Sequence, residues 1–348
     1  MLRIEPPGKA RRLTYHGQIA PAICLGLVCA FIIAVSTAAA QSVNLADVRL
    51  RDPQIFADEA TQTYYLVSSI ARPPAPAGRE RNLGVSVFIS KDLVNWQGPI
   101  DVFTVPPDAW ARHDVWAPEM HRYQGKYYIF TTFDSTDKYP EQWRGWLPRV
   151  KRGCVTAVAD SPLGPFHLLQ NAPSTPADMM TLDGTLWVED GQPYLVYCHE
   201  WVQISNGTVE LLRLKPDLSA TEGEPVMLFR GSDAPWALPS KTYGCFVTDG
   251  PWPYRTKTGK LLMIWSGFGA AGYTVGIAES ESGKITGPWK QQPGPLFARD
   301  GGHAALLRTF DGRLMITLHQ PNKNPNERMR MFEVEDTGDT LRIRKLPQ

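Results

Sequence analysis

A short pattern recurs five times along this chain, and it constrains the fold more than any other feature. Each copy has an acidic, polar or aromatic residue, an apolar strand, a tight turn and a second apolar or aromatic strand. Repetition at such a period indicates an array of like units. If the array closes into a ring, the residues that open the copies gather near its centre. They are Asp52, Trp116, Asp183, Asp249 and His303.

Each period also contains a third strand signal, and clusters of Gly, Pro, Asp and Ser separate the strands. Such clusters between apolar runs are typical of hairpins. Three clear strands and a weaker fourth per unit predict an all-β, five-bladed β-propeller. We expect the residues before Asp52, including Val43 and Leu45, to add a strand to the final blade and close the ring. The third-strand signals are residues 85–90, 154–159, 209–214, 274–279 and 329–334.

The first forty residues do not belong to this pattern. A basic segment with Arg11 and Arg12 precedes an apolar segment, residues 23–35, and Ala38-Ala39-Ala40 then fits the small-residue rule for cleavage. The apolar segment is shorter than the roughly 20 residues of a membrane-spanning helix, which argues against an uncleaved anchor. We therefore predict a signal peptide over residues 1–40, cleavage after Ala40 and a periplasmic or secreted protein without stable membrane insertion. Residues 41–348 then form a single domain, the five-bladed β-propeller.

Charge and cysteine content narrow the choice of partners. The formal net charge of +1 becomes −2 once the four basic residues and one Glu of residues 1–40 are removed. A nearly neutral surface gives no reason to expect nucleic acid or an anionic membrane as partner. Cys154, Cys198 and Cys245 remain, without the spacing of a zinc site. We expect them to be buried, with at most one disulfide, and we expect no organic cofactor.

The repeat places chemically active residues at one mouth of the ring, where ligands bind in propellers. The starts of the inner strands bring Asp52, Glu119, Asp183, Asp249 and His303 together, with Trp116 beside them. The second strands are antiparallel to the first, so their ends return to the same face. These ends carry Ser69, His199, Glu200, Trp201, Ser266 and His319.

Carboxylates crowded among aromatic side chains suit glycoside hydrolysis, in which one carboxylate acts as base and another is held protonated as acid. Any single Asp-Gly pair is usually a turn, but Asp residues at three repeat positions argue for a site. The candidates for catalysis are Asp52, Asp183, Asp249 and Glu200. The candidates for substrate binding are Trp116, Glu119, His199 and Trp201.

The order of the motifs carries a resemblance that covers about residues 45–340. The matching segments are Arg51-Asp-Pro-Gln-Ile-Phe, Val115-Trp-Ala-Pro-Glu-Met, Leu182-Asp-Gly-Thr-Leu-Trp, Thr248-Asp-Gly-Pro and Gly301-Gly-His. Together they resemble glycoside hydrolase family 43, the five-bladed propellers of the arabinanase, α-L-arabinofuranosidase and β-xylosidase group. The resemblance implies an inverting enzyme that acts on arabinofuranosyl or xylosyl linkages of plant cell-wall polysaccharides such as arabinan and xylan.

The resemblance also implies roles for individual residues. The general base falls on Asp52, and the carboxylate that raises the pKa of the acid falls on Asp183. Trp116 matches a substrate-facing aromatic residue. His303 matches the channel histidine that helps to hold a calcium ion through water, so we expect calcium in the central channel.

One position departs from the family pattern. The general acid of the family is usually Glu in a Glu-Gly-Pro motif, whereas this chain has Asp249, whose side chain is one methylene shorter. Three interpretations follow, in order of preference: Asp249 is the acid, Glu200 supplies the proton, or the protein is a non-catalytic carbohydrate-binding propeller. The related fructan-cleaving propellers, which retain configuration, are a further alternative, but their Asn-Asp-Pro-Asn motif is absent here.

Overall fold

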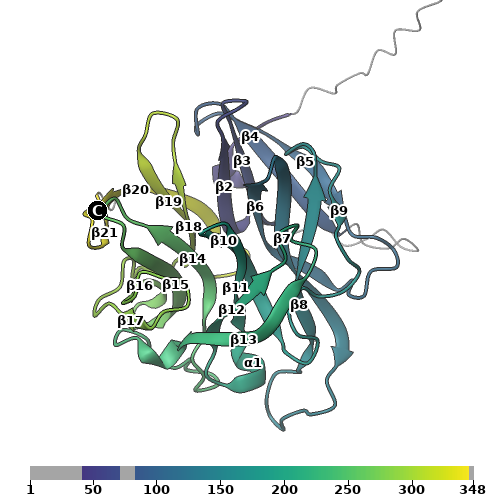
Figure 1. The fold of residues 1–348 in the computed structure, drawn as a ribbon, viewed down its shortest axis with the longest axis vertical. Coiled ribbons are helices and arrows are strands. Elements are labelled where there is room, and N and C mark those ends of the chain that lie inside the picture. The colour runs from purple at the N-terminus through teal and green to yellow at the C-terminus, as the bar shows by residue number, and fades with distance from the viewer. Residues whose placement is uncertain (1–40, 71–82, 345–348) are drawn as a thin grey trace, which may run out of the picture. The chain divides into compact units, whose positions relative to one another are not determined.

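The computed structural model describes residues 41–70 and 83–344. Their strands form five antiparallel sheets, one of five strands and four of four strands. Figure 1 shows the sheets arranged around a common centre, with one strand of each sheet innermost. This arrangement confirms the predicted five-bladed propeller. The predicted signal peptide, residues 1–40, lies outside the described residues.

The four strands of each blade follow one another in the chain, from the centre outward. The innermost strands are β2 (Leu50–Asp58), β6 (Asp114–Tyr123), β10 (Thr181–Glu189), β14 (Asp249–Arg255) and β18 (Gly302–Arg308). The second strands are β3 (Thr63–Ile70), β7 (Lys126–Lys138), β11 (Gln192–His199), β15 (Leu261–Gly269) and β19 (Leu314–Gln320). The third strands are β4 (Gly84–Ser90), β8 (Val150–Ala159), β12 (Thr208–Leu214), β16 (Gly272–Ser280) and β20 (Arg328–Asp336). The outer strands are β5 (Trp96–Thr104), β9 (His167–Leu168), β13 (Thr221–Arg230), β17 (Trp289–Gln291) and β21 (Leu341–Ile343).

Local sequence explains the tight hairpins between the first and second strands. Gln124-Gly125 joins β6 to β7, and Asp190-Gly191 joins β10 to β11. Both residues of each pair have positive φ, 47° and 83° in the first pair and 51° and 80° in the second. Two successive positive φ values match the twist of the flanking strands, and glycine adopts the second at little cost. The turn residues therefore fix the register of these hairpins.

The hydrophobic core lies between the blades. One buried cluster combines Leu50 and Leu66 of blade one with Leu307 and Met315 of blade five, so side-chain packing joins the first blade to the last. The prediction that the residues around Val43 and Leu45 complete the final blade is wrong. The short strand β1 (Ser42–Val43) pairs with β5 at the outer edge of blade one, because β21 already occupies the outer edge of blade five.

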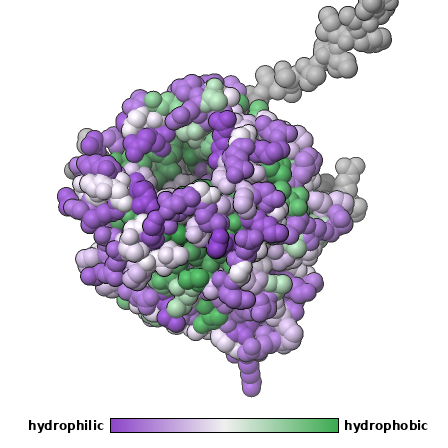
Figure 2. All heavy atoms as spheres, viewed as in Figure 1, coloured by the Kyte–Doolittle hydropathy of each residue, from purple (hydrophilic) through white to green (hydrophobic). Residues whose placement is uncertain are grey.

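The cysteines behave as predicted within the described part of the chain, where Cys154, Cys198 and Cys245 are buried and form no disulfide. Figure 2 shows a largely hydrophilic surface in which hydrophobic residues lie mainly in hollows between polar ones. Among the described residues, no helix has the length and apolar character needed to cross a membrane.

Candidate active site

Every inner strand is interrupted by an irregularity at the same place. The register between the first and second strands shifts after Arg51, Trp116, Leu182, Asp249 and Gly302. The next residue in each strand has positive φ, between 43° and 57°: Asp52, Ala117, Asp183, Gly250 and His303. Such a bulge interrupts the alternation of a strand and redirects its side chains. Two consecutive residues of an inner strand can therefore face the same mouth of the channel.

The sequence repeat predicts that Asp52, Glu119, Asp183, Asp249 and His303 occupy equivalent positions, and the bulges show that this prediction is only partly right. Asp52, Asp183 and His303 share one structural position, but Ala117 and Gly250 occupy it in the other two blades. Asp249 lies one residue earlier and Glu119 two residues later. Asp249 still faces the mouth, whereas Glu119 lies deeper in the channel, where it is buried and pairs with His121 (Oε2 to Nε2, 3.0 Å).

In blade four, the bulge position has room only for glycine, which is Gly250. Its φ is +53°, and a Cβ atom added there would lie 2.9 Å from the ring of His303. A side chain would thus meet both backbone strain and a steric clash. The Asp249-Gly250 pair therefore brings the backbone of blade four close to the histidine of blade five.

Hydrogen bonds across the blade junctions hold the bulges in place. At four junctions, the N–H of the positive-φ residue donates to a side chain on the second strand of the preceding blade. The pairs are Asp52 to His319 Nδ1 (3.2 Å), Ala117 to Ser69 Oγ (2.6 Å), Asp183 to Thr132 Oγ1 (3.0 Å) and His303 to Ser266 Oγ (2.8 Å). These bonds satisfy buried backbone donors that the bulges remove from the sheet.

The junction between blades three and four differs. Cys198 of β11 pairs with Leu182 and so corresponds to Ser69, Thr132, Ser266 and His319 in the other blades. Thiol sulfur is a weak acceptor, and the N–H of Gly250 donates instead to Oδ2 of Asp183 (3.0 Å). The carboxylate of Asp183 is thus held against the strand that carries Asp249.

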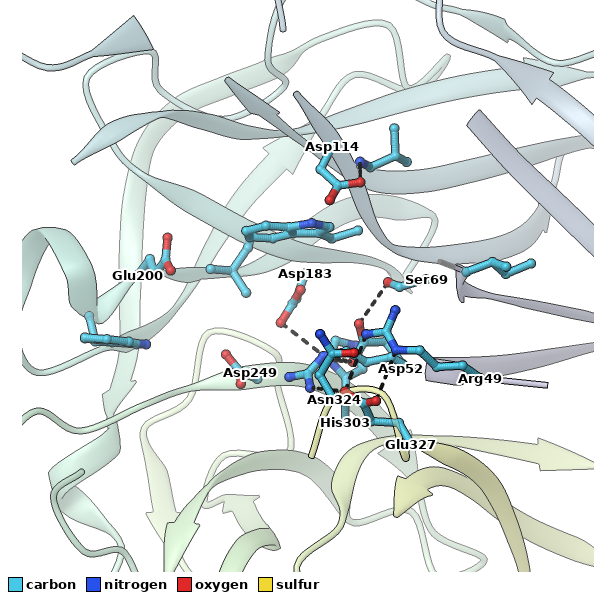
Figure 3. Close-up of a pocket in the computed structure, with 16 residues that line it drawn as sticks. Arg49, Asp52, Ser69, Asp114, Asp183, Glu200, Asp249, His303, Asn324 and Glu327 are labelled. Atoms are coloured by element: carbon cyan, nitrogen blue, oxygen red, sulfur yellow. Dashed lines mark hydrogen bonds and ion pairs between the residues drawn. The ribbon is translucent and has the colours of Figure 1, made fainter. Parts of the chain in front are cut away.

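The mouth of the channel contains a cavity of about 490 Å³. Figure 3 shows Asp52, Asp183, Asp249 and His303 grouped in it, with Glu200 on the side of Asp183 that is away from Asp52. Residues from all five blades contribute, as the repeat predicts. The lining residues are Arg49, Arg51, Asp52, Ser69, Ile70, Asp114, Val115, Trp116, Leu182, Asp183, Glu200, Trp201, Asp249, His303, Asn324 and Glu327.

Asp52 is buried among cations and donors. Its Oδ2 accepts a hydrogen bond from Ser69 (2.9 Å), and its Oδ1 lies 3.3 Å from His303 Nδ1 and 3.6 Å from Arg51 Nε. Burial raises the pKa of this carboxyl group, but the charges of His303 and Arg51 outweigh burial and lower the pKa to about 2. Asp52 is therefore ionised at neutral pH. Its Oδ1 makes no hydrogen bond to any described residue, but it is itself buried beside His303, His319 and Arg51.

The pKa values of Asp183 and Asp249 are raised, whereas that of Asp52 is lowered. Burial raises the pKa of Asp183, and the neighbouring Asp249 and Asp52 raise it further against the opposing effect of His303. Burial also raises the pKa of Asp249, although the hydroxyl of Tyr273 donates to its Oδ2 at 2.7 Å and favours the ionised form. Two interacting acids with raised pKa values share protons as a pair. His303 is therefore flanked by one ionised carboxylate, Asp52, and by a pair of acids that retains a proton.

The two histidines beside Asp52 differ in charge. His319 accepts the N–H of Asp52 at Nδ1, and burial lowers its pKa to about 4, so it is neutral. Burial also opposes ionisation of His303, but Asp52, Asp183 and Asp249 raise its pKa above the ordinary value. His303 Nδ1 lies 3.3 Å from Asp52 and 3.7 Å from Asp183. The imidazolium of His303 thus joins the base to the second carboxylate.

The described residues do not present a direct metal site. No group of three or more His, Cys, Asp or Glu side chains in residues 41–70 and 83–344 is arranged to hold a metal ion. His303 also has its Nδ1 directed at carboxylates, and its raised pKa favours the cation over the neutral ligand. Calcium held through water by His303 stays a prediction.

Glu200 and its neighbours form the opposite wall. Arg152 donates to Oε2 of Glu200 and, through Nε, to Oδ1 of Asp134 at 2.8 Å. The guanidinium also lies over the ring of Trp116, 4.1 Å from its centre. Burial raises the pKa of Glu200 above its ordinary value, and the charge and hydrogen bond of Arg152 only partly oppose this effect.

Two residues expected to bind substrate lie elsewhere. His199 does not line the cavity: its Nε2 is 2.8 Å from Gln203 Oε1 and its Nδ1 is 3.4 Å from Glu210 Oε1. Glu119 does not line the cavity either, because the bulge at Ala117 places it deeper in the channel. His199 ends β11, and the chain then enters the short helix α1 (Trp201–Ile204), which holds Gln203 beside the ring. Trp116 and Trp201 do line the cavity, as predicted.

The sequence analysis missed a cluster of charges beside Asp52. Glu327, fully buried, accepts from Arg49 Nε (3.1 Å) and pairs with Arg51 Nη1 (3.4 Å), and Arg51 also donates to Asn322 (2.7 Å). The arginines come from the start of blade one and their partners from the loop after β19. The position of Arg51 next to Asp52 in the sequence could have indicated a positive charge beside the candidate base. Nothing in the sequence indicates that Arg51 pairs with Glu327.

Comparisons with known proteins agree with this geometry. Residues 45–345 match the family described as glycosyl hydrolases family 43. An α-L-arabinofuranosidase B of Pyricularia oryzae is 23% identical over 67% of this chain and 47% of its own length. An extracellular exo-α-(1→5)-L-arabinofuranosidase of Streptomyces avermitilis is 22% identical over 66% of this chain and 51% of its own length. The chain thus spans about half the length of these curated relatives.

Solved structures extend the likeness over the whole propeller. The endo-arabinase from Bacteroides thetaiotaomicron is 39% identical, with a TM-score of 0.72, and the match covers 84% of this chain and 96% of that chain. A thermostable family-43 glycoside hydrolase matches with a TM-score of 0.68 over 86% of this chain and 95% of that chain. At 22% identity, that second likeness concerns the fold alone.

Proposed function

This chain belongs to family 43 of the glycosyl hydrolases, and we propose that it hydrolyses arabinofuranosyl or xylosyl linkages of plant cell-wall polysaccharides or oligosaccharides. The observation that carries the proposal is the division of charge in one cavity. Asp52 has a lowered pKa, and Asp183 and Asp249 have raised ones. Carboxyl groups whose environments push their pKa values apart are suited to act as base and acid. The relatives named for arabinofuranosidase and arabinase activity support the substrate class.

In this mechanism Asp52 is the general base. Its ionised carboxylate takes a proton from a water molecule, and the water oxygen attacks the anomeric carbon as the bond to the leaving oxygen breaks. Asp249 donates its proton to that oxygen, so the sugar hydroxyl leaves neutral. Asp183, bonded to the N–H of Gly250, positions Asp249 and forms with it the pair of acids that keeps a proton. Attack by water on the face opposite the leaving group inverts the anomeric configuration.

The surroundings of the two candidate acids favour Asp249 over Glu200. Burial raises the pKa of Glu200 as well, but the guanidinium of Arg152 bonded to its Oε2 favours the ionised form, which cannot donate a proton. Burial raises the pKa of Asp249, and the charge of Asp52 adds to this effect, so its protonated form is favoured. Tyr273 holds Asp249 from behind at 2.7 Å, so the shorter side chain has a fixed position. Glu200 is then a hydrogen-bond acceptor for substrate hydroxyls.

The experiment that tests the proposal compares mature wild-type protein with Asp52→Asn. The substrates are nitrophenyl α-L-arabinofuranoside, nitrophenyl β-xyloside, debranched arabinan and xylan, and released sugar is measured. We expect wild-type turnover on at least one pentoside and a loss of about 10²–10⁴-fold in Asp52→Asn, because the base no longer accepts a proton. Circular dichroism of both proteins controls for folding.

Two outcomes would contradict this proposal in different ways. Turnover by Asp52→Asn within a few-fold of wild type would remove Asp52 from the mechanism. A wild-type protein that binds arabinan or xylan in calorimetry but releases no sugar would favour the alternative, a carbohydrate-binding propeller.

Periplasmic or secreted location and calcium in the channel belong to the same proposal. Cleavage after Ala40 in the purified protein and loss of thermal stability on chelation would support them.

A further inference from the structure

A tyrosine from the third strand of blade four reaches the carboxyl group of Asp249. Tyr273 lies near the start of β16, and its hydroxyl donates to Oδ2 of Asp249 at 2.7 Å. Tyr273 is 1% exposed and does not line the catalytic cavity, whereas Asp249 is half-buried at the wall of that cavity. The phenol therefore contacts the carboxyl group from inside the protein, on the side that a substrate does not reach.

The ring of Tyr273 is held on several sides. It stacks on the ring of His319, with centroids 5.4 Å apart and planes 22° apart. It also packs against Gly302 of blade five, where an added Cβ atom would lie 2.6 Å from Cε1 of the ring. The backbone of Tyr273 donates to Oδ1 of Asp300 (3.2 Å) and accepts the N–H of Gly301 (2.9 Å). Both the backbone and the ring thus fix the position of the hydroxyl.

This fixed hydroxyl limits the length of the acid at position 249. One more methylene group would move the carboxyl group by about 1.5 Å, the length of one C–C bond. A carboxyl group moved toward Tyr273 would come far closer than the normal hydrogen-bond distance, and one turned away would lose the hydrogen bond. The tyrosine cannot retreat, because His319 and Gly302 pack against its ring. Aspartate at this position therefore fits Tyr273, and glutamate does not.

The same hydrogen bond determines which oxygen of Asp249 carries the acidic proton. A protonated carboxyl group has one hydroxyl oxygen that donates and one carbonyl oxygen that accepts. Burial raises the pKa of Tyr273 well above its ordinary value, so the phenol keeps its proton and remains a donor. Because Oδ2 of Asp249 accepts this bond, the acidic proton lies on Oδ1. Oδ1 is then the oxygen that donates to the leaving group.

We propose that Tyr273 is the positioning residue of the acid: it holds the short side chain of Asp249 by Oδ2, leaves Oδ1 to protonate the leaving oxygen, and makes aspartate rather than glutamate the working acid. The inference rests on the proposed function, in which Asp249 donates a proton. Tyr273 acts through Asp249 and does not touch the reacting atoms.

The first test removes only the hydroxyl. Tyr273→Phe keeps the ring and its packing but frees the carboxyl group of Asp249. Arabinotriose has a poor leaving group that needs the proton, whereas nitrophenyl α-L-arabinofuranoside needs it little. We expect kcat for arabinotriose to fall about tenfold with KM nearly unchanged, because an interaction that serves only the transition state is lost. For the nitrophenyl substrate, kcat should stay within twofold.

The matched control is Tyr254→Phe in the same blade. It removes another phenol that donates to an aspartate, Oδ2 of Asp336 at 3.0 Å, outside the catalytic cavity. This variant should change kcat on neither substrate. Circular dichroism of all variants controls for folding.

The second test changes the length of the acid. Asp249→Glu should lower kcat for arabinotriose about 10²-fold, because the carboxyl group is misplaced by about 1 Å or more. Adding Tyr273→Phe to Asp249→Glu should raise kcat about tenfold above that of Asp249→Glu alone, since the absent hydroxyl makes room for the extra methylene group. The same tyrosine substitution thus lowers activity beside aspartate and raises it beside glutamate. A merely structural role of Tyr273 would lower both.

Three results would contradict this account. Equal losses on both substrates in Tyr273→Phe, or no loss on either, would overturn the positioning role. A double variant no more active than Asp249→Glu would show that the hydroxyl does not set the length of the acid. A wild-type protein inactive on both substrates would instead contradict the proposed function itself. If Asp249→Glu does not fold, the two substrates compared in Tyr273→Phe still decide whether Tyr273 positions the acid.

Discussion

At every junction between blades, the buried N–H of a bulge needs a hydrogen-bond acceptor. The junction between blades three and four supplies a different acceptor from the other four junctions. At the four, a serine, threonine or histidine side chain accepts the N–H of the bulge. At the remaining junction a cysteine occupies the corresponding place, and Asp183 accepts the N–H of Gly250. The four bonds serve the fold. The fifth also attaches a carboxylate to the strand that carries Asp249, so the difference lies where acid catalysis is proposed.

This contrast separates structural residues from catalytic ones. A repeat protein reuses one backbone solution, and a departure from the common solution in one unit points to function when a chemically active group replaces a neutral one. The bulge itself is common to all blades, because each places residues at the mouth of the channel. The residue that accepts the bulge N–H is what distinguishes the acid side of the site.

The largest effect expected at the distinctive junction comes from Asp249→Ala. We expect hydrolysis of arabino-oligosaccharides, which have poor leaving groups, to fall about 10²–10⁴-fold. Nitrophenyl arabinofuranoside, whose leaving group needs little protonation, should lose much less. The measurement is kcat on both substrates. Glu200→Ala is the matched control, with a smaller and uniform loss, and a leaving-group dependence that follows Glu200 would move the proton donor to blade three.

An intermediate effect is expected when an ordinary junction is broken. Thr132→Val keeps the shape of the side chain but leaves the buried N–H of Asp183 without its acceptor. An unsatisfied buried donor costs about 1–3 kcal/mol, so the free energy of unfolding in urea should fall by that amount. Thr132→Ser, which restores the hydroxyl, should recover most of the loss. Equal stability of the valine and wild-type proteins would show that the junction bond contributes nothing.

The smallest effect is expected from Cys198→Ser, which makes the distinctive junction like the others. The new hydroxyl should compete for the N–H of Gly250, and Asp183 then loses a donor that favours its ionised form. The apparent pKa of the Asp183–Asp249 pair rises. Because the pair must keep a proton for catalysis, the alkaline limb of the pH–rate profile should move to higher pH, by about half a unit. Cys245→Ser, a control at another buried cysteine, should leave the profile unchanged, and an unmoved limb in Cys198→Ser would refute the competition.

The sequence predicts the ring, its blades and most of the residues at its mouth, because a fivefold pattern of strands and turns repeats visibly along the chain. It does not predict the bulges, since a register shift depends on pairing between strands. Glu119 was therefore expected at the mouth, although Ala117 occupies the corresponding position. Arg152 lies in a third strand, and its contacts with Glu200 and Trp116 bring together three segments that are distant in sequence. The short strand β1 could pair with the outer edge of more than one blade, and the sequence does not distinguish these edges. Only the structure shows that β1 pairs with β5.

The most direct measurement for the central claim is the anomeric configuration of the first sugar released. Proton NMR recorded during early turnover, before mutarotation, distinguishes the two anomers. If Asp52 is a general base that activates water, as its lowered pKa indicates, the product has the configuration opposite to that of the substrate. A product that keeps the configuration of the substrate would require a covalent intermediate, and it would contradict the assignment of Asp52 as the base.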